Sequence, residues 1–168
     1  MDEQLMAPDS SAEIRMNRNP DTVMAEAKLC AKALGRMVEQ TKAFTVISGR
    51  KHLHFTAWQT LGSFFRVTPR VRETRPLNIE GVRGFEAVAE VLHIPSGQIV
   101  AVADAQCTDD EPNWDIRPTS KGDQKVPLFQ RRSMAQTRAC SKALLLVRSW
   151  WVGAAGQRAT AAEEMEGG

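Results

Sequence analysis

Tyrosine is absent from this chain of 168 residues, cysteine occurs only three times, and long apolar runs are missing. Cys30, Cys107 and Cys140 are scattered and have no CxxC or Cys/His spacing, which argues against a disulfide framework or structural zinc and is typical of a reducing compartment. No stretch approaches the roughly 18–20 apolar residues of a membrane span. The first residues are acidic and polar, unlike a signal peptide. We therefore expect a cytoplasmic protein with no membrane partner.

Nucleotide-binding motifs are also missing. The sequence contains no G-x-x-x-x-G-K-[ST] segment and no G-x-G-x-x-G segment after a predicted strand. The dipeptide Lys121-Gly122 lacks the further glycines and the flanking strand and helix of a phosphate-binding loop. We therefore expect a protein that works without ATP and without a cofactor.

Charge is distributed unevenly along the chain, although the net charge is only +2. Residues 1–20 and 154–168 each carry a net charge of −2, so that residues 21–153 carry +6. The two ends are rich in small or polar residues and lack hydrophobic periodicity. We predict a disordered N-terminal arm at 1–20, one folded domain at 21–153 and a flexible acidic tail at 154–168. A basic body favours a polyanionic partner.

The stretch 128–151 contains no glycine or proline and predicts one long helix. At about 100° per residue, Arg131, Arg138 and Lys142 form one cationic stripe, which we expect on the outside. The opposite sector is apolar and would pack on the core. It comprises Ala139, Ala143, Leu144, Leu146, Val147, Trp150 and Trp151.

Hydrophobic periodicity along the rest of the chain predicts an α+β domain with an antiparallel sheet. An N-terminal helix precedes a β-β-α-β-β-β-α core whose sheet packs on the long helix. Residues 108–126 are interpreted as a polar loop. The other predicted elements are a helix at 21–41, strands at 44–47 and 51–55, a helix at 57–65, and strands at 67–75, 82–93 and 98–107.

Carboxylates on the polar rows of the predicted sheet leave an enzyme as an alternative. Glu86, Glu90 and Asp104 lie on neighbouring strands, and two-metal nucleases need clustered carboxylates. However, no triplet with a basic partner appears on a strand, and no histidine joins the set. A metal-dependent nuclease and a plain nucleic-acid-binding accessory protein both stay open as alternatives to a non-enzymatic function.

Basic residues dominate residues 43–83, where seven lysines and arginines face only Glu73 and Glu80. Such residues neutralise phosphates, and a groove along the backbone of a single strand fits them better than base readout of a duplex. Trp114, in the predicted loop, would be a local anchor or else a stacking or subunit contact. The predicted DNA-binding residues are Arg50, Lys51, Arg70, Arg72, Arg131, Arg138 and Lys142.

Three segments carry a resemblance to a known family. They are residues 47–51 (ISGRK) in the first hairpin, 58–62 (WQTLG) in the short helix, and 133–144 (SMAQTRACSKAL) in the long helix. With the three-stranded meander between them, the pattern over residues 22–153 resembles the ring-forming single-strand annealing proteins of the Rad fifty-two type, including their phage and bacterial relatives.

The resemblance implies ATP-independent binding of single-stranded DNA and annealing of complementary strands in recombination and repair. It implies a homo-oligomer, as a ring or helical filament, in the cytoplasm of a bacterium or a phage-infected host. It also implies an inner basic site made by Arg50, Lys51 and Lys142, where Ser141 stands in place of a frequent second basic residue. Any recruitment of a host single-strand binding protein or recombinase would use the ends of the chain.

Overall fold

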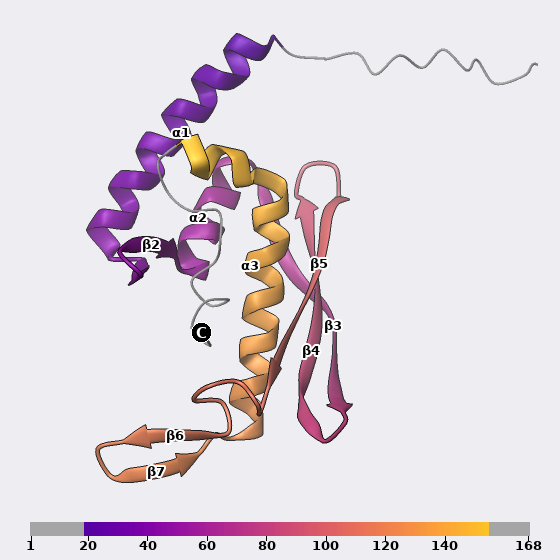
Figure 1. The fold of residues 1–168 in the computed structure, drawn as a ribbon. Helices are drawn as coiled ribbons and strands as arrows, with labels where there is room; N and C mark the ends of the chain where they lie inside the picture. The colour runs from indigo at the N-terminus through magenta and orange to yellow at the C-terminus, as the bar shows by residue number, and fades with distance from the viewer. Residues whose placement is uncertain (1–18, 155–168) are drawn as a thin grey trace, which may run out of the picture.

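The computed structural model describes residues 19–154, which form a mixed α+β fold with antiparallel sheets and a C-terminal helix that packs on a sheet (Figure 1). The elements are α1 (Pro20–Thr41), β1 (Phe44–Ile47), β2 (Arg50–Leu53), α2 (Phe55–Phe64), β3 (Val67–Ile79), β4 (Val82–His93), β5 (Gln98–Thr108), β6 (Ile116–Thr119), β7 (Gly122–Lys125) and α3 (Leu128–Ala154).

Helix α1 begins earlier than the sequence indicated, because the side chain of Asn19 caps it. Asn19 Oδ1 accepts a hydrogen bond from the backbone N–H of Asp21 at 2.8 Å, and Pro20 occupies the first turn, where its missing N–H costs nothing. Residues 19 and 20 therefore belong to the folded part. The rest of the predicted arm, residues 1–18, and the tail from residue 155 lie outside the described residues.

Strands β1 and β2 form a hairpin as predicted. Ser48 and Gly49 make its turn with φ angles of 51° and 75°, which is the left-handed geometry that a tight hairpin requires. The register places Thr45 opposite His52 and Ile47 opposite Arg50. Facing residues in an antiparallel pair point to the same side, so Arg50 shares a face of the hairpin with Ile47.

The main sheet has the order β3-β4-β5, and α3 covers one of its faces (Figure 1). The covered rows carry small side chains, and these allow close packing of the helix. At Gly84 a Cβ atom would lie 2.1 Å from the carbonyl oxygen of Cys107, so a side chain there would disrupt the pairing of β4 with β5. The buried residues of the helix–sheet interface include Ala87, Ala89, Val91, Ala103, Cys107, Ala135 and Ala139.

A β-bulge breaks the predicted alternation of β3. The pairing with β4 shifts between Val71 and Glu73, which leaves Arg72 unpaired in the ladder. A shift of one residue moves the following side chains to the other face. Thr74 therefore lies on the α3 side of the sheet, opposite to the face of Arg70, and its hydroxyl accepts a hydrogen bond from Gln136 at 2.9 Å.

The segment 108–126 is more ordered than the predicted polar loop, because residues 116–125 form the hairpin β6–β7. The chain reverses through Ser120-Lys121, and Gly122 has a φ of 100°. This hairpin extends from the N-terminal end of α3 (Figure 1). Helix α3 spans most of the fold, but no helix within residues 19–154 is long and apolar enough to cross a membrane.

Candidate nucleic-acid interface

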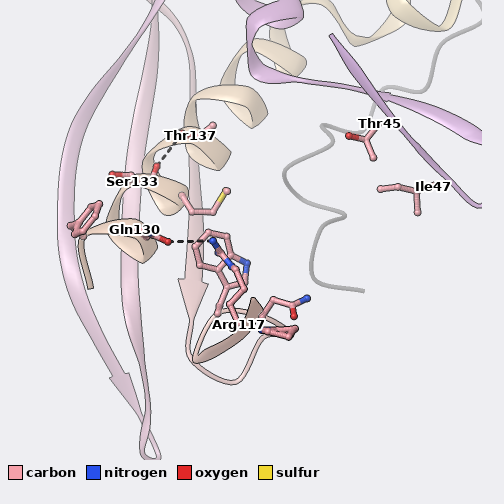
Figure 2. Close-up of a pocket in the computed structure, with 11 residues that line it drawn as sticks. Thr45, Ile47, Arg117, Gln130, Ser133 and Thr137 are labelled. Atoms are coloured by element: carbon pink, nitrogen blue, oxygen red, sulfur yellow. Dashed lines mark hydrogen bonds between the residues drawn. The ribbon is translucent and has the colours of Figure 1, made fainter. Parts of the chain in front are cut away.

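A cleft of about 800 Å³ opens between the β1–β2 hairpin, the β6–β7 hairpin and the N-terminal half of α3. Figure 2 shows Thr45 and Ile47 on one side of it and the side chains of α3 on the other. Among the residues that the structure describes, the lining contains a guanidinium, two amides and three hydroxyl groups but no carboxylate. It comprises Thr45, Ile47, Asn113, Trp114, Arg117, Pro118, Phe129, Gln130, Ser133, Met134 and Thr137.

The β1–β2 hairpin places its two predicted DNA-binding residues on opposite faces. Arg50 is exposed and shares the face of Ile47, which lines the cleft. Lys51 points the other way. Its ammonium pairs with Glu39 of α1 and lies 4.4 Å from the centroid of the Phe44 ring. Arg50 is therefore exposed on the face of the hairpin that carries the cleft-lining Ile47, whereas Lys51 connects the hairpin to α1.

The opposite wall contributes an arginine that the sequence did not single out. The guanidinium of Arg117 lies 5.3 Å from the centroid of the Trp114 ring, and its Nη1 donates to Gln130 Oε1 at 3.4 Å (Figure 2). Trp114 is itself almost fully buried, as a local anchor would be. Ile116-Arg117-Pro118-Thr119 alternates apolar and polar residues before the turn residues Ser120-Lys121-Gly122, a hairpin signal that would have placed Arg117 on a strand.

Two predicted DNA-binding residues on β3 are engaged with a carboxylate. Arg70 Nη2 lies 2.9 Å from Glu90 Oε2, and Arg72 Nη1 lies 3.4 Å from Glu90 Oε1. Glu90 is 3% exposed because these two side chains cover it on the sheet face away from α3. The one carboxylate balances only one of the two guanidinium charges, so the group keeps a net charge of +1, and both arginines remain more than half exposed.

The prediction of an exposed cationic stripe on the long helix is wrong for Arg131 and Arg138, which are 2% and 6% exposed. Arg138 Nη1 pairs with Glu111 at 2.7 Å and donates to the Gln106 carbonyl at 2.8 Å. Arg131 Nη1 lies 3.4 Å from Asp109 Oδ2. The carboxylates of the loop after β5 pair with these arginines, and the buried ion pairs connect the loop to α3. Neither arginine lines the cleft.

Lys142 is exposed, as predicted, but it does not line the cleft. Its Nζ donates to the carbonyl oxygen of Asp104 on β5 at 3.1 Å, on the sheet side of α3. The structure therefore does not bring Arg50, Lys51 and Lys142 together around the cleft. Leu146, expected in the apolar sector, is 58% exposed, and Trp150 and Trp151 lie outside the side chains that the structure describes.

The carboxylates considered for a nuclease are held in separate contacts. Glu86 pairs with Arg75 and accepts a hydrogen bond from Gln106 Nε2 at 3.2 Å, and Glu90 pairs with the arginines of β3. The hydrogen bond from Gln106 and that from Arg75 lower the pKa of Glu86. Within residues 19–154, no three histidine, cysteine, aspartate or glutamate side chains gather in a cluster that could hold a metal ion.

Asp109 connects β4, the loop after β5 and α3. Its Oδ1 accepts the backbone N–H of Arg83 at 2.7 Å, and this hydrogen bond lowers the pKa of Asp109. The charges of Arg131 and Arg83 lower it further. The folded state therefore binds the proton less readily than the unfolded chain does.

Asp109→Asn is expected to make stability less sensitive to acid. A depressed carboxyl pKa contributes stability that is present above the unfolded value, about 4, and is lost as the pH falls through the folded value. Urea unfolding midpoints of the wild type should therefore fall more steeply below pH 5 than those of the variant. Asp123→Asn, at an exposed position on β7, is the control. Parallel acid limbs for the wild type and Asp109→Asn would contradict this role.

Comparisons of this chain with protein-family models, with curated proteins and with solved structures found no match.

Proposed function

We propose that this protein binds single-stranded DNA in the cleft between its two small hairpins and anneals complementary strands without ATP. The observation that carries the proposal is a cleft whose lining, among the described residues, contains no carboxylate, with Arg117 in one wall and the exposed Arg50 beside Ile47, which lines the other. Cations on both sides of a groove neutralise the phosphates of a strand that runs between them. The hydroxyl and amide groups of α3 add neutral contacts along the same path.

Annealing also requires many binding units along one strand, because single phosphate contacts are weak. We propose a homo-oligomer, in which the sheet face away from α3 supports contact between copies. Exposed apolar side chains gather at the β5 side of that sheet, where Ile99, Val100 and Val102 are each 46–48% exposed. Sedimentation of the pure protein with and without an oligonucleotide tests this, and a monomer under both conditions would contradict it.

Replacing both Arg50 and Arg117 with alanine is expected to weaken single-strand binding and to reduce its salt dependence. Each lost phosphate contact removes about 0.7 from the slope of log affinity against log salt concentration. Fluorescence anisotropy of a labelled oligonucleotide over a salt series measures both quantities. The matched control replaces Lys28 and Arg36, two exposed residues of α1, with alanine. The control variant should keep the salt slope of the wild type, and only the cleft variant should show a reduced slope.

An annealing assay with complementary strands, without nucleotide and divalent cation, separates the proposed function from plain binding. The wild type should accelerate duplex formation, and the Arg50/Arg117 variant should lose most of this acceleration. Binding without acceleration would make the protein an accessory binder. Cleavage of the strand when Mg²⁺ is added would favour a nuclease. An unchanged affinity and salt slope for the Arg50/Arg117 variant would remove the cleft from the interface.

A further inference from the structure

Phe129 is a large aromatic side chain that the fold leaves in solvent. It lies in the first turn of α3, lines the cleft and is 66% exposed. Trp114, the other aromatic among the described lining residues, is only 6% exposed and is in contact with Arg117. An exposed aromatic ring inside a concave surface offers a planar apolar face to a ligand.

The groups that line the cleft together with Phe129 complement a heteroaromatic ring with polar edges. Met134 and Pro118 add apolar surface to the lining, and Gln130 follows Phe129 directly. The Gln130 Oε1 atom accepts from Arg117, and its amide nitrogen donates no hydrogen bond to any residue of the described chain. Amide donors of this kind pair with the acceptor atoms on the edges of nucleic-acid bases.

The charge of the cleft also favours a polynucleotide over a peptide or a neutral ligand. The described part of its lining carries the guanidinium of Arg117 and no acid, so an anionic group attached to the bound ring would find a cation in the same cleft. A nucleotide of a single strand provides both parts, because the phosphates flank an unpaired base.

We propose that the cleft holds one unpaired base of the bound strand, stacked on the ring of Phe129. This inference rests on the proposed function and adds to it a contact to the base, in addition to the phosphate contacts of Arg50 and Arg117. The stack depends on the planar face of the base, so it is tolerant of sequence. In each protomer, one base of the strand then lies in the cleft and is not stacked on the neighbouring bases.

The test measures the affinity of Phe129 variants for a single strand and for the same backbone carrying abasic sites. Phe129→Ala should bind the base-bearing strand about 5- to 100-fold more weakly, as the loss of one stacked base predicts, with an unchanged salt slope. Phe129→Trp should retain the affinity. On the abasic strand the wild type and Phe129→Ala should bind equally. Leu128→Ala is the matched control, because Leu128 is 62% exposed beside Phe129 but does not line the cleft.

Two results would overturn the inference while leaving the proposed function intact. One is an unchanged affinity of Phe129→Ala for the base-bearing strand. The other is an equal loss on the abasic strand, which would assign Phe129 a role in shaping the cleft. A wild type that binds neither strand would instead overturn the proposed function and the inference together. Far-UV circular dichroism of each variant checks that the helix content is retained.

Discussion

Arg138→Ala is expected to lower the free energy of unfolding by about 3–5 kcal/mol, the usual cost of removing one partner of a buried ion pair. The guanidinium of Arg138 satisfies the Glu111 carboxylate and the Gln106 carbonyl, and it lies 5.9 Å from the centroid of the Trp114 ring. Alanine would leave a largely buried carboxylate without its cation and open a cavity beside Trp114. Urea unfolding followed by far-UV circular dichroism measures the loss.

Two variants show whether the unpaired charge causes this loss. Arg132→Ala removes an arginine from an exposed position of α3. It should change the free energy of unfolding by no more than about 0.5 kcal/mol. Arg138→Met combined with Glu111→Gln removes both charges and keeps an acceptor for the backbone N–H of Thr108. The pair should be clearly more stable than Arg138→Ala. Equal stability of Arg138→Ala and the wild type would show that the ion pair contributes nothing.

Trp58→Ala should also be severely destabilising, by about 3–5 kcal/mol, because it empties the largest fully buried site of the core. The indole is 0% exposed in α2, and its Nε1–H has no hydrogen-bond partner within residues 19–154. Trp58→Phe removes this unsatisfied donor and keeps most of the apolar volume, so its cost should be less than half as large. Thermal and urea unfolding of the two variants test the difference. Equal losses would show that the indole volume is irrelevant to packing.

Apart from the hairpin β6–β7, the element order could be predicted from hydrophobic periodicity, whereas the roles of the basic residues on α3 could not. Arg131, Arg138 and Lys142 do lie on related positions of the helix, as their spacing indicates. The prediction was wrong about which side of the helix is exposed to solvent at Arg131 and Arg138. Arginine has a long apolar stem and can be buried when a carboxylate pairs with it. Those carboxylates, Asp109 and Glu111, come from a loop far away in the sequence, and no local pattern shows that they reach the helix.

The opposite orientations of Arg50 and Lys51 on the first hairpin could have been predicted from the sequence. Side chains alternate along a strand, so the adjacent residues Arg50 and Lys51 could not both face one cleft. The bulge in β3, by contrast, could not have been predicted. Nothing in the residues around Arg72 signals the bulge that moves Thr74 to the other face. The cleft itself depends on how β6–β7 and α3 are placed, which only the tertiary structure shows.

Strand β3 forms an edge of the main sheet, and its composition limits how copies of the protein can join. Pro69 and Pro76 interrupt the row of N–H donors along this strand, and prolines are tolerated in strands where that side faces solvent. The arginines on either side add like charge. Together they discourage strand addition at this edge. If the protein gathers many copies on one polynucleotide, as we propose, this edge protects the assembly against β-aggregation along β3.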